Sequence, residues 1–156
     1  MPGQETHHGR NNGAASRAKV ITAVDTNILL DVFVADPTFA QSSSEALRDC
    51  LREGALVASE VVWAETATVF GDAGGFRDAM LKLSAAFSPM TEEAANKAAQ
   101  AWRRYRAGGG RRDRIVADFL IGAHALVTAD RLLTRDRGFY RQYFSGLRIL
   151  DPTTAR

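Results

Sequence analysis

Four acidic residues occupy positions that are unusual for a solvated surface: Asp25, Glu65, Asp118 and Asp136. Carboxylates that converge in a cleft cannot all stay ionised without a cation between them. Oxygen donors without clustered His or Cys select Mg²⁺, with Mn²⁺ as a substitute, over zinc. Such a cation polarises a phosphoryl oxygen and lowers the pKa of a bound water. If the four acids converge, they predict metal-assisted phosphate chemistry, with one or two ions.

Two of these acids follow strand-like segments. Asp25 comes directly after the apolar run 20–24, and Asp136 follows the run 132–134. The carboxyl ends of parallel strands form the edge where open α/β sheets bind ligands. The alternative for an Asp after a strand is a helix N-cap or a turn residue.

The other two acids lie on predicted helices. At 100° per residue, Glu65 lies about 60° from Val62, and Asp118 lies about 60° from Ile115, so both flank an apolar stripe. Flank positions are common on helices, so the shared position of the two acids is weak support for a common site. The remaining acids, Asp31 among them, have surface, turn or helix-end interpretations.

The elements that must position these acids alternate between short apolar runs and helical patterns, which predicts an α/β fold with a parallel sheet. Strands are expected at 20–24, 55–58, 132–134 and 148–150. Helices are expected at 27–33, from the serines at 42–44 to Gly54, at 59–70, at 76–87, from Thr91 to the arginines that follow, and at 113–126.

The length of 156 residues corresponds to one domain. We predict a disordered extension at 1–19, a folded domain at 20–152 and a short tail at 153–156. The single cysteine excludes an internal disulfide and fits a cytoplasmic location. The sequence shows no secretory signal and no apolar run long enough for a membrane span, so no membrane partner is expected.

The net charge of +2 resides in the first 19 residues, where Arg10, Arg17 and Lys19 stand against Glu5. The predicted domain is therefore balanced and not globally basic. Arginines do gather at 103–114, around a glycine run, where they could hold a phosphate backbone. A solvated helix end with cationic residues is the alternative interpretation.

Four segments resemble the motifs of PIN domains, in the family's order. They are Val24-Asp25-Thr26-Asn27-Ile28-Leu29-Leu30, Val61-Val62-Trp63-Ala64-Glu65, the segment from Asp118 to Ala125, and the segment from Leu132 to Tyr140. Each motif alone is weak, but the series covers about residues 20–152. The subfamily most resembled is the VapC-type toxin of bacterial toxin–antitoxin pairs.

This resemblance implies a three-layer α/β/α sandwich with a mainly parallel sheet. It further implies a Mg²⁺-dependent endoribonuclease that forms a homodimer and is inhibited by a small antitoxin. Asp25 and Asp118 would be the principal metal ligands, Glu65 a ligand or the base that orients water, and Asp136 would complete the site. Asn27 and Thr134 match supporting positions.

The arginines that bracket Asp118 and Asp136 in sequence are candidates for RNA phosphates: Arg112, Arg114, Arg135 and Arg137. His124, on a predicted helix among small residues, is expected to be a packing residue. Two other functions stay open: a PIN-like module that binds RNA or a partner without turnover, and a small-molecule phosphohydrolase. No glycine-rich phosphate loop supports the latter.

Overall fold

The computed structural model describes residues 19–111 and 116–154. Its strands and helices alternate along the chain. In chain order they are β1 (Val20–Val24), α1 (Thr26–Phe33), α2 (Ala40–Glu53), β2 (Gly54–Ala58), α3 (Glu60–Ala67), α4 (Ala73–Leu83), β3 (Ala85–Phe87), α5 (Glu92–Ala107), α6 (Val116–Thr128), β4 (Arg131–Leu133), α7 (Arg137–Tyr143) and β5 (Ile149–Leu150).

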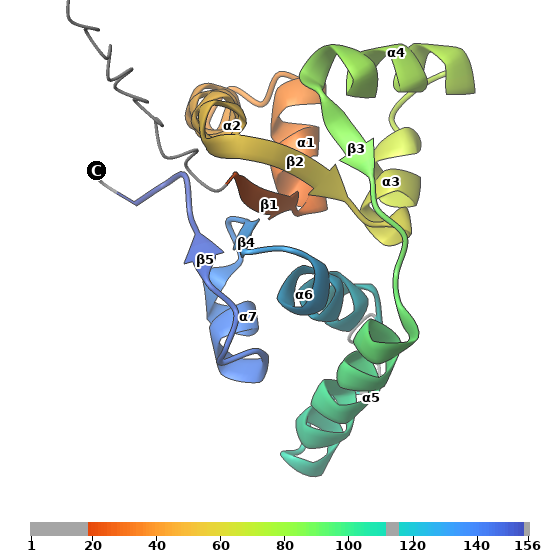
Figure 1. Cartoon of the computed structure of the whole chain (residues 1–156), viewed down its shortest axis with the longest axis vertical. Coiled ribbons are helices and arrows are strands. Elements are labelled where there is room, and N and C mark those ends of the chain that lie inside the picture. The colour runs from red at the N-terminus through yellow and green to blue at the C-terminus, as the bar shows by residue number, and fades with distance from the viewer. Residues whose placement is uncertain (1–18, 112–115, 155–156) are drawn as a thin grey trace, which may run out of the picture.

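The five strands form one sheet in the order β3-β2-β1-β4-β5, and every neighbouring pair is parallel. Right-handed crossovers place the helices between β1 and β3 on one face and those between β3 and β5 on the other. In Figure 1, α1 and α2 lie on one side of the strands, and α5, α6 and α7 lie on the opposite side. The predicted three-layer α/β/α sandwich is therefore confirmed.

The strand order reverses between β1 and β4, because the chain builds outward from β1 to β3 and then returns to the other side of β1. Ligands of open α/β sheets bind at such a switch point, beyond the carboxyl ends of the strands. Asp25 follows β1 and Thr134 follows β4. The backbone N–H of Asp25 donates to the carbonyl of Leu133 over 2.9 Å, which joins the two strand ends directly.

Side-chain caps explain where several helices begin. Ser59 caps α3 through the Val62 N–H and Thr91 caps α5 through the Ala94 N–H, as expected from the sequence. The expected start of α2 at the serines 42–44 is wrong. Phe39 is its N-cap residue and makes no side-chain cap bond, and the serines lie inside the helix. Burial of Ala46, Leu47 and Cys50 stabilises this helix instead.

Two elements differ from the sequence-based expectation. The segment 76–87 is not one helix: α4 ends at Leu83, Ser84 takes a left-handed φ of 59°, and residues 85–87 become the edge strand β3. The helix α7, between β4 and β5, was not expected. The helix α7 matters for the site, because it carries Tyr140, which contacts Asp25.

The core lies on both faces of the sheet. On one face the buried residues include Ile28 and Leu29 of α1 and Leu47 of α2, and on the other they include Phe119 of α6 and Tyr140 of α7. Within the described ranges, the chain forms no helix of the length and apolar character that crossing a bilayer requires.

Candidate active site

Asp25 is the most deeply placed of the four acids, with 5% of its surface exposed. Its Oδ1 accepts the backbone N–H of Thr26 over 2.7 Å, so the side chain also caps α1. Its Oδ2 accepts the hydroxyls of Thr134 (2.7 Å) and Tyr140 (3.2 Å) and the amide of Asn27 (3.3 Å). The capping alternative and the site hypothesis are therefore compatible, because Oδ1 caps α1 while Oδ2 accepts hydrogen bonds from other elements.

Burial raises the pKa of Asp25 to about 6, because the buried charged form loses its hydration. The hydrogen bonds from Thr134, Thr26 and Tyr140 oppose this rise, and the neighbouring charge of Asp118 adds to it. A nearby cation would act in the opposite direction and favour the ionised carboxylate. The environment of Asp25 is thus unfavourable for an isolated charge and suited to one that meets a cation.

Glu65 is connected to Asp25 through one intervening residue. The Thr26 hydroxyl donates to Glu65 Oε1 over 3.0 Å, while the Thr26 backbone N–H donates to Asp25. Glu65 lies on α3, which begins directly after β2. Its side chain is exposed, whereas Val62 and Thr66 of the same helix are buried. The predicted flank position on the helix is therefore what the structure shows.

Asp118 and Asp136 belong to α6 and to the start of α7, the helices on the other face of the sheet. Asp118 lies half-buried in the first turn of α6, near enough for its charge to raise the pKa values of Asp25 and Tyr140. Asp136 is the N-cap residue of α7, and its backbone N–H donates to the Thr134 hydroxyl over 3.0 Å. Asn27 Nδ2 also lies 3.4 Å from the Thr134 hydroxyl oxygen. Thr134 thus links Asp25, Asn27 and Asp136.

No cluster of three or more His, Cys, Asp or Glu side chains is placed to hold a metal ion within residues 19–111 and 116–154. The four acids still fit a hard divalent cation by their donor chemistry, because all of them offer carboxylate oxygens. The raised pKa of Asp25 supports this fit, since it reflects burial and a like charge that a cation would relieve. Asp25, Asp118, Glu65 and Asp136 are the residues that would hold it.

The sequence-based interpretation of Asp31 as a surface or helix-end acid is wrong. Asp31 is buried and forms a bidentate ion pair with Arg135, at 2.8 Å to Nε and 2.9 Å to Nη2. Ser43 donates to the same carboxylate over 2.7 Å, and the Arg135 guanidinium lies 3.9 Å from the centre of the Phe39 ring. This clamp fixes α1 and α2 against the segment that follows β4, which carries Thr134 and Asp136.

The four arginines predicted to contact RNA have different surroundings. Arg112 and Arg114 lie outside the described residues. Arg135 is engaged by Asp31, and its backbone N–H donates to Asn27 Oδ1 over 3.4 Å. Arg137 is half exposed, with Nε 3.6 Å from Asp151 Oδ2. A contact between any of them and RNA stays a prediction.

His124 is buried on α6, and its Nε2 lies 3.0 Å from the Ser88 hydroxyl. Burial lowers the pKa of His124, and the charge of Glu60 opposes that effect. The neutral imidazole therefore packs with a hydrogen-bond partner at the end of β3, in agreement with the expected packing role.

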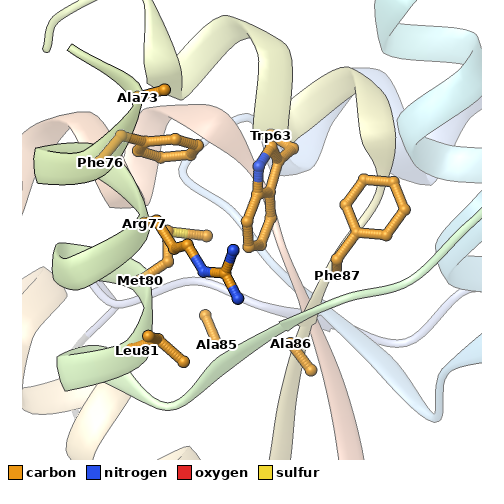
Figure 2. A pocket seen from close by; sticks show the side chains of 9 residues that line it. All are labelled: Trp63, Ala73, Phe76, Arg77, Met80, Leu81, Ala85, Ala86 and Phe87. Carbon is orange, nitrogen blue, oxygen red and sulfur yellow. The ribbon is translucent and has the colours of Figure 1, made fainter.

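A pocket beside the sheet edge has a different chemistry. It lies between α3, α4 and β3, and Figure 2 shows Trp63 between Phe76 and Phe87, with Arg77 reaching across from α4. Trp63 packs edge-to-face on both phenylalanines, at ring-centre distances of 5.2 and 5.3 Å. Its lining is mainly apolar and includes none of the four acids. The carboxylates at the switch point therefore remain the candidate for chemistry.

Sequence reasoning missed Tyr140 as a member of the site. Tyr140 lies next to Phe139 at the end of the fourth motif, where the sequence gives it no role beyond that pattern. Its aromatic spacing with Phe144 could have predicted α7 and a buried face. That spacing carries no information about the hydroxyl, which reaches Asp25 only after α7 has packed on the sheet.

Comparison with known proteins agrees with this geometry. The model of the PIN domain family matches residues 22–145, which include all four acids. No curated protein matches the sequence of the chain. The chain belongs to the PIN-domain family.

Solved structures share the fold at low sequence identity. The VapBC2 complex from Rickettsia felis, bound to a DNA fragment from its promoter, matches with a TM-score of 0.66 at 15% identity, over 84% of this chain and 98% of that one. VapBC-1 from nontypeable Haemophilus influenzae matches with a TM-score of 0.66 at 20% identity, over 86% and 99%. A toxin–antitoxin complex from Klebsiella pneumoniae matches with a TM-score of 0.62 at 18% identity, over 86% and 99%.

Proposed function

We propose that this chain is a Mg²⁺-dependent endoribonuclease that hydrolyses RNA phosphodiester bonds. The observation that carries the proposal is the buried Asp25 carboxyl at the β1–β4 switch point, with Asp118 close enough to raise its pKa. The PIN-domain family match supports the same proposal. Mn²⁺ is expected to substitute for Mg²⁺ because both accept carboxylate oxygens.

We propose for the four acids the roles that the family resemblance implies, and their places in the structure support these roles. Asp25 and Asp118 would be the main ligands, since Asp25 is held by fixed donors and Asp118, on α6, lies near enough for its charge to raise the pKa of Asp25. The exposed Glu65, held by Thr26, would be a further ligand or the base that orients the attacking water. Asp136, tied to Thr134, would complete the site. The bound cation would polarise the phosphoryl oxygen and lower the pKa of its water.

The RNA would approach the carboxylates from the side of the sheet where the carboxyl ends of β1 and β4 lie. Negatively charged phosphates require positive charge near an acidic site. Arg137, exposed in the first turn of α7 directly after Asp136, is one described residue that can supply it. We keep Arg112, Arg114 and Arg135 in the same proposal.

Within a cell, we propose that the chain acts as a VapC-type toxin that a small antitoxin neutralises, and that it forms a homodimer. Solved complexes with the same fold, among them a toxin–antitoxin complex, support this proposal. A cytoplasmic location belongs to the same proposal. A search for a short open reading frame next to the gene, with co-expression and co-purification of its product, tests the antitoxin, and light scattering tests the homodimer.

Expression of the protein in bacteria, followed by mapping of RNA 5′ ends, tests the function. We expect growth arrest and new ends at defined sites for the wild type, and neither for Asp25→Ala or Asp118→Ala. Asp78→Ala is the matched control, because Asp78 is exposed on α4 and should leave cleavage unchanged. If the wild type produces no new ends from any RNA, the alternative is favoured: a PIN-like module that binds RNA or a partner without turnover.

A further inference from the structure

Tyr140 is a fully buried tyrosine whose hydroxyl points at the candidate site. It lies on α7, and its hydroxyl donates to Asp25 Oδ2 over 3.2 Å. Its ring packs against Phe139 at 5.2 Å and against Phe144 at 6.3 Å, so neighbours on the same segment fix its direction. Packing therefore delivers this hydroxyl to the carboxyl group.

The hydroxyl of Tyr140 is the donor in this contact. A phenol acts as a hydrogen-bond donor toward a carboxylate. The helix α7 thus supplies a neutral donor to the buried Asp25 carboxyl group.

The Tyr140 bond adds a second hydroxyl to the same oxygen of Asp25. Thr134 reaches Oδ2 from the end of β4, and Tyr140 reaches it from α7. Two donors from separate elements fix the orientation of a carboxylate better than one. Partners of this kind commonly change the metal affinity of the ligand they hold by about 10- to 100-fold.

We propose that Tyr140 is a positioning residue that orients the Asp25 carboxylate for the divalent cation. It acts through Asp25 and does not itself contact the cation or the RNA. This inference rests on the proposed metal-dependent function. The helix α7 then has a second role besides covering the sheet, because it carries the Tyr140 hydroxyl that holds Asp25.

The first test compares cation binding by the wild type and by Tyr140→Phe, which keeps the ring and removes the hydroxyl. Calorimetric titration with Mn²⁺ and Mg²⁺ should give a dissociation constant about tenfold higher for Tyr140→Phe. RNA cleavage should need about tenfold more Mg²⁺ for half its maximal rate, and the rate at saturating Mg²⁺ should return close to that of the wild type. A purely structural defect would lower the saturated rate without this shift.

The matched control is Tyr143→Phe, three residues further along the chain on the same helix. The Tyr143 ring packs against Tyr105 and Phe119, and its hydroxyl has no role in the proposal. Its affinity for Mg²⁺ should equal that of the wild type.

A second measurement does not depend on the folding of Tyr140→Phe. The chain contains three tyrosines, so the double variant Tyr105→Phe/Tyr143→Phe leaves Tyr140 as the only one. Addition of Mg²⁺, which does not absorb, should produce a tyrosine difference spectrum in this variant, because the charge that the hydroxyl faces changes. The half-point of the spectral change should match the dissociation constant from calorimetry.

The outcomes separate this inference from the function on which it rests. If the wild type binds Mg²⁺ and cleaves RNA, but Tyr140→Phe binds as tightly and the single-tyrosine variant gives no difference spectrum, only the role of Tyr140 is overturned. If the wild type binds neither Mg²⁺ nor Mn²⁺, the metal-dependent function is overturned together with it. Weaker binding by Tyr140→Phe, with an unchanged Tyr143→Phe, supports the proposal.

Discussion

At the scale of single residues, Asp25 combines two opposing properties. Its burial and the nearby Asp118 disfavour a charge, while hydrogen bonds from Thr26, Thr134 and Tyr140 favour one. A carboxylate that served only as a helix cap would not need so many partners from separate elements. We interpret these opposing effects as typical of a carboxylate that is oriented to bind a cation.

His124 provides a prediction about pH. Burial lowers its pKa below the ordinary value of 6.5, so the unfolded chain binds a proton more readily than the folded one. The stability linked to the neutral imidazole is present above pH 6.5 and is lost as the pH falls through the folded-state pKa. Between pH 7 and pH 5, the free energy of unfolding should therefore fall more steeply for the wild type than for His124→Gln.

Denaturant unfolding at several pH values measures both slopes. Titratable groups that both proteins share contribute equally to the two slopes of unfolding free energy against pH. The difference between the slopes therefore reports on His124. Parallel curves for the wild type and His124→Gln would show that the imidazole does not resist protonation in the fold.

The four acids could be predicted from the sequence, because strand ends and helix flanks leave a local pattern. The supporting residues Asn27 and Thr134 came from the resemblance to PIN domains. Asp25, Asn27 and Thr134 do lie together. The pairing of Asp31 with Arg135 could not be predicted, since the two residues are 104 positions apart and nothing local distinguishes Asp31 from a surface acid. The Tyr140 hydroxyl is a similar case, because its partner is set by how α7 packs.

At the scale of elements, the helices α6 and α7 approach each other closely at Gly122. A Cβ atom at this position would lie 2.5 Å from the nearest ring carbon of Phe144, the residue that ends α7. Gly122→Ala should therefore lower the free energy of unfolding by about 1–3 kcal/mol, because the ring or the helix must shift. Chemical denaturation measures this change.

Gly138 offers the matched control within α7. A Cβ atom there would meet no atom within 4 Å, and alanine favours a helix over glycine. Gly138→Ala should thus be neutral or stabilise the protein by up to about 1 kcal/mol. Equal destabilisation by both substitutions would contradict a specific contact at Gly122.

The elements that sequence reasoning missed are short. Helical spacing continues through 76–87, and the turn of the backbone at Ser84 leaves no strong sequence signal, because serine seldom takes a positive φ. The strand β3 has only three residues, too few for a period of two to be recognised. The spacing of Phe139, Tyr140, Tyr143 and Phe144 does indicate a helix, so α7 could have been predicted.

At the scale of the whole molecule, we expect the ionised Asp25 carboxylate to lower the stability of the fold when no cation is bound. The pKa of Asp25 is raised from 3.8 to about 6, so its favourable contribution is present below pH 3.8 and is lost as the pH rises through about 6. At pH 8 with EDTA, Asp25→Asn should raise the free energy of unfolding by about 1–3 kcal/mol.

Mg²⁺ should make the wild type more stable than Asp25→Asn, the reverse of the result in EDTA. At 100 times its dissociation constant, a bound ion stabilises the folded wild type by about 2.7 kcal/mol, and Asp25→Asn should gain much less. Thermal unfolding with and without Mg²⁺ measures both effects, with Asp78→Asn as the control that should follow the wild type. A variant that gains as much from Mg²⁺ as the wild type would place the ion away from Asp25.

The central claim is that a divalent ion held by these carboxylates cleaves RNA, and an EDTA add-back assay with the purified protein tests it most directly. We predict no cleavage of bacterial RNA in EDTA, defined fragments once excess Mg²⁺ is restored, and no fragments from Asp25→Ala or Asp118→Ala under either condition. Cleavage by the wild type that continues in EDTA, or a folded Asp25→Ala that cleaves at the wild-type rate, would contradict the account.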